Sequence, residues 1–233
     1  MIRSPYRISV IIPVFNEEAH IVATVRHLQK FCANDYIEEI LIVDGGSTDN
    51  TLSVLKNTGA TVLNAPKGRA VQMNYGAAKA KGSILYFLHA DTLPPKDFGK
   101  SIVEAVLHDH QAGCFQMIFD SDSRFLEFFA WFSRLNIRLC RGGDQSLFIT
   151  KKLFQALNGF NEDYHIYEDN EFIGRLYKHT PFKILPQRVK TSARRYEKHG
   201  KIKLQYHFGM IHLKSRLGAG PDQLYQYYRQ HIA

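Results

Sequence analysis

Cysteine is scarce in this chain, and its copies form no pattern. Cys32, Cys114 and Cys140 lie far apart, their number is odd, and no Cys-x-x-Cys pair occurs in the sequence. A disulfide-stabilised domain and a cysteine-based zinc site both need paired or closely spaced cysteines. We therefore expect reduced thiols, as in a cytoplasmic protein, with neither a disulfide framework nor a zinc site.

Long apolar runs, linkers and repeats are also missing. No segment approaches the roughly 18–20 consecutive apolar residues of a membrane-spanning helix. The opening stretch, MIRSPYRISVIIPV, does not follow the pattern of a secretory signal. We therefore expect a cytoplasmic protein that is soluble or at most peripheral to a membrane, folded as a single domain over residues 1–233.

Glycine-rich phosphate loops are absent from the turn where they would be needed. The first predicted strand, ISVIIPV at residues 8–14, is followed by FNEE, not by Gly-x-Gly-x-x-Gly or a P-loop. Redox Rossmann units and P-loop proteins place glycines there because the backbone must approach a phosphate. A sugar nucleotidyltransferase would also need a glycine-rich basic loop. A nucleotide site in this chain must therefore use carboxylates.

Positive charge is plentiful, but it is concentrated in the second half of the chain. The net charge is +8, yet residues 1–120 hold 11 Lys/Arg against 12 Asp/Glu, whereas residues 121–233 hold 19 against 10. A basic half suggests phosphate, nucleic acid or an anionic membrane surface as partner, with ordinary solubility charge as the alternative. No recognised nucleic-acid-binding motif is present, so we expect no nucleic acid.

Strand and helix patterns alternate over the first 90 residues. Short apolar runs predict strands at residues 8–14, 38–44, 60–66 and 83–89. Between them, helices are predicted after Asn16, up to Lys56 and at residues 68–81, and Asn16 is the expected cap of the first. This order predicts an α/β fold with a mostly parallel central sheet flanked by helices and joined by right-handed crossovers.

The second half is less regular. Helices are predicted at residues 95–108, 123–139, 151–160 and 166–179, and strands at 112–119 and 145–150. FKILP at 182–186 and RVKTSA at 188–193 are predicted as paired strands, and the tail from about Lys201 has helical spacing. The aromatic helix at 123–139 is predicted to belong to the core, with an apolar binding groove as the alternative.

Two predicted strands carry a carboxylate to their C-terminal ends. Asp44 ends the strand at 38–44, and Asp91 follows the strand at 83–89. In an open α/β sheet, ligands bind at this edge. A carboxylate there can accept from a ribose hydroxyl or hold a divalent metal, and Lys67 and Arg69 can offset diphosphate charge. Each aspartate alone also suits a turn, so the prediction rests on their joint arrangement.

These segments resemble a known family. VIIPVFNEE, LIVDGGSTDNT, GRAVQMNYGA and YFLHADT are similar to the glycosyltransferase family 2 pattern. The series GR..QMN.GA, FLHADT, GDQ..F, ED and TSARRYE..G resembles the bacterial radical-SAM/selenodomain-associated glycosyltransferase subgroup, over about residues 8–200. The resemblance implies a GT-A fold, a nucleotide-sugar donor, Mn²⁺ or Mg²⁺, and inversion at the anomeric carbon. It implies a nucleotide-sugar-binding half at 1–95, an irregular acceptor and catalytic half at 96–200, and a helical tail at 201–233.

The resemblance also assigns the donor and metal sites. The positions that match donor-binding residues of the family in the first half are Pro13, Phe15, Asn16, Glu17, Asp44, Lys67, Gly68, Arg69 and Asn74. Asp91 matches the last aspartate of the Asp-x-Asp metal motif, but the first position of that motif is His89 here. A neutral histidine can ligate Mn²⁺ or hydrogen-bond ribose, so His89 is a candidate for both roles. A strand-end histidine satisfied by the backbone is the alternative.

The candidate base lies in the segment YEDNE. Asp169 matches the catalytic aspartate of the family, with Glu168 beside it. Crowded carboxylates raise one another's pKa, which suits a general base that works near neutral pH. Acidic residues placed at a helix start because of the helix dipole are the alternative.

Two further segments are candidates for the acceptor side and the diphosphate. Asp144 and Gln145 match an acceptor-side turn of the family, and a Gly-Gly turn with a helical cap is the alternative. Arg194 and Arg195 are two adjacent guanidinium groups that can clamp a diphosphate, or else belong to a solvated charge run.

The leading prediction is metal-dependent, inverting transfer of a hexose from a nucleotide-diphosphate sugar, with UDP preferred by family analogy. Asp169 is the expected base, and the acceptor is a lipid phosphate, a glycan or a small molecule. A lipid acceptor would bring the basic, aromatic second half into peripheral contact with an anionic membrane. The alternatives are an inactive nucleotide-sugar-binding module, suggested by His89, and a nucleic-acid-binding protein, suggested by the basic half.

Overall fold

A single sheet forms the centre of the computed structural model, which describes residues 5–31 and 36–232. Its strand order is β3-β2-β1-β4-β7-β6-β8-β5. The first four run parallel: β3 (Thr61–Asn64), β2 (Ile37–Asp44), β1 (Ile8–Val14) and β4 (Ile84–Phe87). The predicted parallel arrangement of this half is confirmed.

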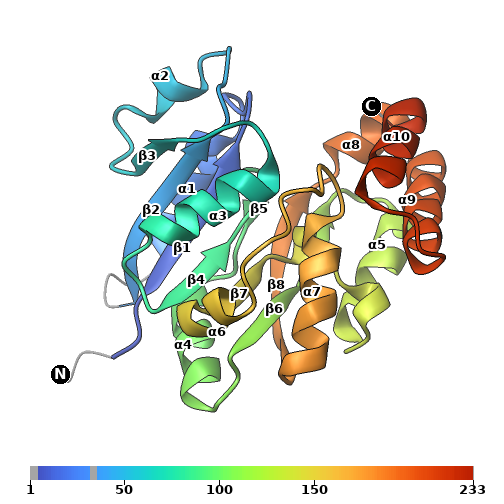
Figure 1. Ribbon diagram of the computed structural model, residues 1–233. Helices are drawn as coiled ribbons and strands as arrows, with labels where there is room; N and C mark the ends of the chain where they lie inside the picture. The colour runs from blue at the N-terminus through green and yellow to red at the C-terminus, as the bar shows by residue number, and fades with distance from the viewer. Residues whose placement is uncertain (1–4, 32–35, 233) are drawn as a thin grey trace.

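Beyond β4 the sheet changes direction. β7 (Leu147–Thr150) pairs antiparallel with β4, and β6 (Ala112–Asp120) pairs antiparallel with β7 and parallel with β8 (Phe182–Ser192). The short β5 (Thr92–Leu93) follows β4 closely in sequence but pairs antiparallel with the end of β8. β5 is therefore last in the strand order although only residues 88–91 separate it from β4, and Figure 1 shows it at the edge where β1 and β4 end.

Helices cover both faces of the sheet. One face packs against α1 (Ile21–Phe31), α2 (Thr51–Leu55) and α4 (Phe98–Leu107). Figure 1 views the other face, which is covered by α3 (Arg69–Lys79), α6 (Lys151–Ala156) and α7 (Glu168–His179). Val10 and Ile11 are neighbours in β1 but belong to opposite cores, as strand geometry requires. Burial on both sides explains why these strands are continuous apolar runs in the sequence.

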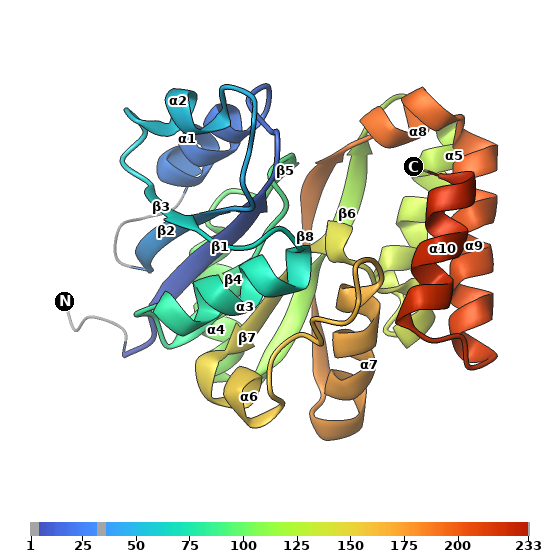
Figure 2. The same cartoon turned by 45° about the horizontal axis from the view of Figure 1, so that its top comes forward.

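The last part of the chain builds a third core. It consists of α5 (Arg124–Trp131), α8 (Arg194–His199), α9 (Lys201–Arg216) and α10 (Pro221–His231), packed around Leu126, Leu204 and Leu224. Figure 2 shows these helices grouped beside β6 and β8, away from α1 and α2. Short 3₁₀ turns, η1 (Phe132–Arg134), η2 (Arg138–Cys140) and η3 (Gly143–Gln145), connect this region to β7. The helical character predicted for the tail is confirmed.

The aromatic helix is shorter than predicted. Instead of continuing to residue 139, α5 ends at Trp131 and is followed by η1 and η2. The buried guanidinium of Arg141 donates to the carbonyls of Ser133 and Leu135 at 2.7 and 2.6 Å. These bonds hold the segment after α5 to a residue outside the helix.

The prediction of two paired strands at 182–186 and 188–193 is wrong, because these residues form one strand, β8. Its register against β6 shifts, so that Leu185 pairs with Phe115 and Arg188 with Gln116. Pro186 is therefore one of the extra residues of a bulge. Proline has no N–H for the ladder, and a bulge is a place where a strand tolerates it.

Asn16 does not cap α1, which begins only at Ile21. Its backbone is left-handed, with φ of 56°, and its side-chain Oδ1 accepts a hydrogen bond from the Thr48 N–H at 2.8 Å. This bond fastens the loop after β1 to the loop after β2. Both loops lie at the edge of the sheet where the candidate site is found.

None of the helices in the described part of the chain has the length and apolar character needed to cross a membrane. Cys114 is a buried free thiol and Cys140 a half-buried one. Cys32 lies outside the described residues. The disulfide and zinc predictions involving Cys32 therefore stay predictions.

Candidate functional site

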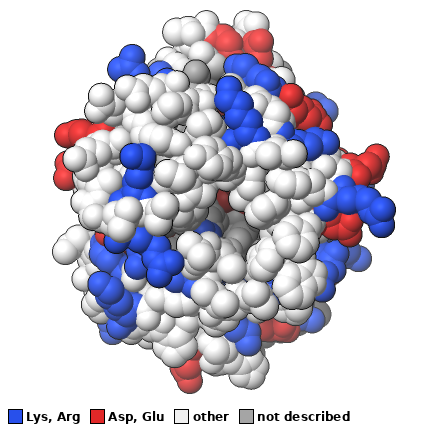
Figure 3. Space-filling view, turned by 90° about the vertical axis from the view of Figure 1, so that its right-hand side faces the viewer, with Lys and Arg blue, Asp and Glu red and all other residues white. Residues whose placement is uncertain are grey.

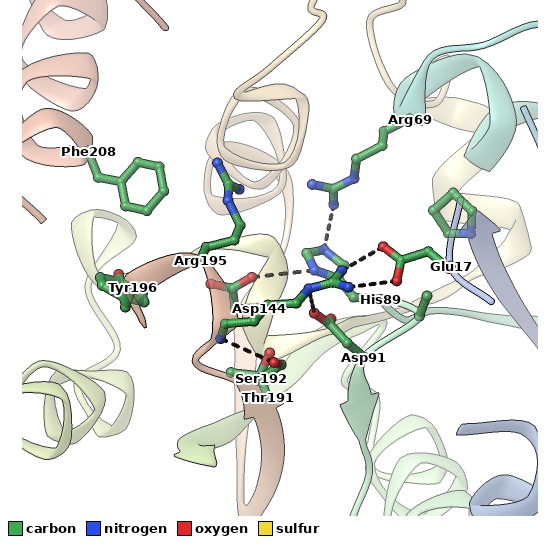
Figure 4. A pocket seen from close by; sticks show the side chains of 13 residues that line it. Glu17, Arg69, His89, Asp91, Asp144, Thr191, Ser192, Arg195, Tyr196 and Phe208 are labelled. Carbon is green, nitrogen blue, oxygen red and sulfur yellow. Dashed lines mark hydrogen bonds and ion pairs between the residues drawn. The ribbon is translucent and has the colours of Figure 1, made fainter. Parts of the chain in front are cut away.

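A cavity of about 290 Å³ lies at the edge of the sheet where β1 and β4 end. Its lining side chains converge from distant segments, as Figure 4 shows: Pro13, Glu17, Arg69, His89, Ala90, Asp91, Asp144, Thr191, Ser192, Arg194, Arg195, Tyr196 and Phe208. The β4–β5 connection explains this convergence. Because β5 pairs with β8, Asp91 lies beside Ser192, whose N–H donates to the Asp91 carbonyl at 3.2 Å.

Two carboxylates in this cavity share one cation, the guanidinium of Arg194. Its two terminal nitrogens donate to the two carboxylate oxygens of Glu17 at 2.9 and 2.6 Å, and its Nε lies 3.1 Å from Asp91 Oδ2. The hydrogen bonds to Glu17 raise the pKa of Arg194; burial opposes this, and the charges of Asp91 and Glu17 add to it. Glu17 and Asp91 together therefore form a position that holds a positive group.

The sequence predicts a divalent cation at Asp91 and His89. Asp91 fits the role, because its carboxylate faces the cavity and already holds a positive group, and Mg²⁺ and Mn²⁺ sites commonly combine few carboxylates with substrate phosphates. Among residues 5–31 and 36–232, no group of three His, Cys, Asp or Glu side chains could hold a metal ion. A cation would therefore take further ligands from the substrate, and Arg194 would have to release Asp91.

His89 lies between an arginine and two aspartates. Its Nε2 contacts the Arg69 guanidinium and lies 4.0 Å from Asp169 Oδ2, and its Nδ1 lies 3.4 Å from Asp144 Oδ1. Burial lowers the pKa of His89 well below its usual value, and the nearby arginine charges lower it further. The ring is therefore neutral at pH 7. Nε2 accepts from Arg69, so Nδ1 carries the proton and points it toward Asp144.

The predicted catalytic pair begins α7, behind this histidine. Arg69 donates to Asp169 Oδ2 at 2.7 Å, and its Nε lies 3.2 Å from Glu168 Oε1. Glu168 is only 1% exposed. Burial raises the pKa of Glu168 to about 7; the Arg69 charge opposes this shift and the Asp169 charge adds to it. Asp169 does not line the cavity itself. It contacts Arg69 and lies 4.0 Å from His89, and both of these residues line the cavity.

The Gly142–Gly143 turn permits this close packing. A Cβ on Gly143 would lie 2.0 Å from Asp169 Oδ2 and 2.8 Å from His89 Nε2, whereas a Cβ on Gly142 would meet nothing within 4 Å. Gly143 is therefore required by the approach of the turn to the site. The same turn, η3, carries Asp144 into the cavity lining.

Other predicted site residues lie near the cavity but do not line it. Asp44 accepts from the N–H groups of Gly46 and Ser47 at 2.9 and 3.0 Å, as its turn alternative predicts. Lys67 places its Nζ 3.6 Å from the centre of the Phe15 ring. Gly68 immediately precedes α3, and Asn16 binds the loop after β2.

Two predicted site residues have structural partners. Asn74 exchanges hydrogen bonds with the backbone N–H and carbonyl of Phe160, both at 2.9 Å. The side chain of Gln145 is buried, donating to the Cys140 carbonyl and accepting from the Cys114 thiol. The acceptor-binding role of Gln145 and the donor-binding role of Asn74 stay predictions.

Five lining residues were not among the predicted site residues, and one of them, Ala90, lies between the predicted His89 and Asp91. Thr191, Ser192 and Tyr196 belong to the segment TSARRYE, whose two arginines alone were selected because of their charge. Phe208 comes from α9. Its helical position could be predicted, but only the packing of α9 against α8, where Phe208 lies beside Arg195 and Tyr196, shows that it faces the cavity.

The chain was compared with known proteins. Residues 9–183 match the model of the family described as glycosyl transferase family 2. An undecaprenyl-phosphate 4-deoxy-4-formamido-L-arabinose transferase of Pseudomonas fluorescens is 29% identical over 110 residues, covering 43% of this chain and 32% of that protein. A dolichyl N-acetyl-alpha-D-glucosaminyl phosphate 3-beta-D-2,3-diacetamido-2,3-dideoxy-beta-D-glucuronosyltransferase of Methanococcus voltae is 34% identical over 108 residues, covering 42% and 33%. The chain thus spans about a third of the length of these curated relatives.

Solved structures share the fold across nearly the whole chain. A mannosyltransferase from Pyrobaculum calidifontis in complex with GDP-Man and Mn²⁺ has a TM-score of 0.68 at 20% identity, covering 97% of this chain and 70% of that one. Glucosyl-3-phosphoglycerate synthase from Mycobacterium tuberculosis, in complex with Mn²⁺, UDP and phosphoglyceric acid, has a TM-score of 0.67 at 19% identity, covering 94% and 81%. The predicted GT-A-like α/β fold is confirmed.

Proposed function

The chain belongs to glycosyl transferase family 2, and on this basis we propose that it transfers a sugar from a nucleotide-diphosphate sugar to an acceptor hydroxyl or phosphate, with inversion at the anomeric carbon. The observation that carries the proposal is the meeting of Asp91 and Glu17 with Arg69, Arg194 and Arg195 in one cavity. Carboxylates can accept from ribose hydroxyls or hold a cation, and guanidinium groups bind a diphosphate through paired hydrogen bonds.

On the donor side, the arginines offset the charge of the diphosphate. Arg194 is held by Glu17 and Asp91, from which it can turn to a phosphate. Asp91 would then hold Mn²⁺ or Mg²⁺ together with donor phosphates. When bound, the cation supplies charge stabilisation to the leaving nucleotide diphosphate. The proposed nucleoside and diphosphate contacts also include Pro13, Phe15, Asn16, Asp44, Lys67, Gly68, Asn74 and His89.

For a hydroxyl acceptor, we assign the base role to Asp169. The acceptor oxygen forms its bond to the anomeric carbon as the bond to the diphosphate breaks, and Asp169 takes the hydroxyl proton. Arg69 holds Oδ2 of Asp169 at 2.7 Å, so a diphosphate that draws Arg69 away also frees the base. Glu168, with its pKa raised to about 7, remains protonated beside it over much of the acidic range.

A phosphate-bearing lipid is the acceptor class that we favour. The names of two curated relatives specify undecaprenyl phosphate and a dolichyl phosphate sugar, and Asp144 of the predicted acceptor-side turn lines the cavity. A glycan or a small molecule is the alternative. UDP as donor nucleotide, the radical-SAM/selenodomain-associated subgroup and a cytoplasmic location belong to the same proposal, whereas peripheral contact with an anionic membrane is a separate proposal with its own test.

An inactive nucleotide-sugar-binding module is the second candidate. His89 favours this candidate in two ways. It occupies the first position of the Asp-x-Asp metal motif, where the family has an aspartate, and it contacts the same Arg69 that holds Asp169. Such a module would bind the donor without turnover, so binding and transfer must be measured separately.

The proposed function is tested with a panel of nucleotide-diphosphate sugars, with and without Mn²⁺. We expect one donor to raise the melting temperature, because it binds the native state alone. We expect Asp169→Asn to keep this shift and to lower turnover on that donor by about 10²-fold or more, since a general base contributes about 10²–10⁴-fold.

Asp163→Asn is the matched control, because Asp163 is exposed in the loop before α7 and the substitution is chemically the same. It should leave both quantities unchanged. A thermal shift without turnover on any acceptor would support the binding module, and the absence of any shift across the panel would refute the proposed function.

A further inference from the structure

α9 carries apolar side chains on two opposite faces. One face packs into the third core through Leu204 and Ile211. The other is exposed to solvent, and its large apolar residues, the last one just beyond the helix end, are Ile202, Tyr206, Leu213 and Leu217. Their spacing at i, i+4, i+11 and i+15 places them on one stripe of a helix. A surface helix of a globular protein normally has a polar outer face, so this stripe needs a partner.

The exposed apolar surface continues onto α5. A hollow at the start of α9 is lined by Phe125, Tyr196, Glu197, Gly200, Lys201, Ile202 and Lys203. From Phe125 a chain of aromatic contacts runs along α5 through Phe129, Phe128 and Phe132 to Trp131, with ring centroids 4.9–5.5 Å apart. Phe128 is 59% exposed and Trp131 48%. We call Phe125, Phe128, Trp131 and the α9 stripe the α5–α9 face.

Basic side chains border this face. The sequence of α9 contains Lys201, Lys203, Lys214 and Arg216 but no Asp or Glu. Figure 3, which views the right-hand side of the molecule in Figure 1, shows a largely uncharged central area with groups of Lys and Arg around it and smaller groups of Asp and Glu among them. Glu127 on α5 and Glu197 in the hollow are two of the acidic residues of this region.

We propose that the α5–α9 face lies on an anionic lipid bilayer. Aromatic and aliphatic side chains enter the boundary between head groups and acyl chains, while flanking Lys and Arg contact anionic head groups. A second copy of the chain fits less well, because a self-complementary contact brings the basic border of one α9 toward another.

The location of this face connects it to the cavity. Tyr196 lines both the hollow and the candidate active site. A phosphate-bearing lipid could therefore reach the cavity from the bilayer beside α9. This last step rests on the proposed function, whereas the contact with the bilayer requires neither donor nor acceptor.

The chain carries its own reporter, because Trp131 is its single tryptophan. We expect its emission to shift to shorter wavelength with vesicles of phosphatidylcholine and phosphatidylglycerol, and to be quenched when the acyl chains are brominated. Vesicles of phosphatidylcholine alone should give little change, and added salt should weaken binding.

The double variant Ile202→Ser/Leu217→Ser should bind anionic vesicles about tenfold or more weakly, since it removes two large apolar side chains from the contact. Leu52→Ser/Val54→Ser is the matched control, because both residues are exposed on α2, far from α9 in Figures 1 and 2. It should bind as the unmodified chain does. Circular dichroism and melting temperature establish that each variant is folded.

An unchanged Trp131 emission, or vesicle binding that Ile202→Ser/Leu217→Ser leaves intact, would overturn the proposal. So would a dimer in sedimentation equilibrium that the same variant dissociates, since the face would then belong to a second copy. Failure here leaves the donor-induced thermal shift in place, whereas failure of the proposed function leaves vesicle binding in place. The two outcomes are therefore distinguishable.

Discussion

Arg69 is the residue that joins the two halves of the candidate site. Its guanidinium contacts His89 and Asp169, and its Nε lies 3.2 Å from Glu168 Oε1. The family resemblance assigns it to the diphosphate, and in the structure it also holds the predicted base. In the proposed mechanism these roles are coupled, because a phosphate that binds Arg69 weakens its hold on Asp169.

The raised pKa of Glu168 predicts how the stability of the folded chain depends on pH. Its folded pKa is raised from 4.5 to about 7, chiefly by burial. Below pH 4.5 the carboxyl is protonated in both the folded and the unfolded chain, and burial of a charge costs nothing. As the pH rises from 4.5 to about 7, only the unfolded chain ionises, so the native chain loses stability at up to about 1.4 kcal/mol per pH unit.

Glu168→Gln cannot ionise, so its free energy of unfolding should rise relative to the unmodified chain through this window and become constant above it. Urea unfolding of both proteins at a series of pH values measures the difference. A difference that does not vary with pH would mean that the folded protein holds Glu168 ionised, and would remove the proposed protonated neighbour of Asp169.

How far the site could be predicted depends on the kind of contact each residue makes. Asp91 follows from its strand end, because the ends of neighbouring parallel strands meet at one edge, and Glu17 follows from the family resemblance; Asp44, predicted by the same strand-end argument, does not line the cavity. Asn74 has its partner Phe160 86 residues later in the chain. A local sequence pattern does not predict a contact between residues so far apart in the chain. A motif therefore identifies the residue but not the partner of its side chain.

At the scale of elements, the strands and helices of the first half were largely predictable, since burial on both faces makes β1 and β4 short apolar runs. The second half was less so. The segment after α5 is held by hydrogen bonds from Arg141. β8 is one continuous strand only because a bulge accommodates Pro186 in its pairing with β6. Both depend on contacts with residues outside the segment itself. Hydrophobic periodicity within the segment does not reveal such contacts.

The η3 turn offers a matched pair of substitutions. Gly143→Ala would place a Cβ 2.0 Å from Asp169 Oδ2, so the turn or the carboxylate must move. Gly142 has extended backbone, with φ of −167°, and open space at its Cβ position. We expect Gly143→Ala to lower transfer by about 10²-fold, the size of effect a misplaced catalytic group produces, and Gly142→Ala to remain active.

Initial rates with a saturating donor, together with the donor-induced thermal shift, measure this difference. Both variants should stay folded, because neither position has left-handed backbone. Equal activity of the two variants would show that the contact between the turn and Asp169 has no part in the reaction.

At the scale of the whole molecule, the sheet joins two layers of helices to a third core, and the helices of this core carry the α5–α9 face on their outer side. The third core takes residues from β6, from the loop before α7 and from the tail, including Phe119, Tyr164 and Leu224. Segments more than 100 residues apart in the chain are therefore packed together. This sharing supports the proposal of a single domain, in which the tail contributes to the stability of the catalytic half.

Leu224→Ala tests that proposal. Leu224 is fully buried in the third core, and its truncation should cost about 2–5 kcal/mol. In a single cooperative domain, Trp131 fluorescence and far-ultraviolet circular dichroism should report one coincident unfolding transition, moved to lower urea as a whole. Leu217→Ala, at an exposed leucine of the same region, should leave the transition in place. If the fluorescence transition moved while most of the dichroism transition did not, the C-terminal helices would unfold as a separate unit, and the chain would be divided into two domains.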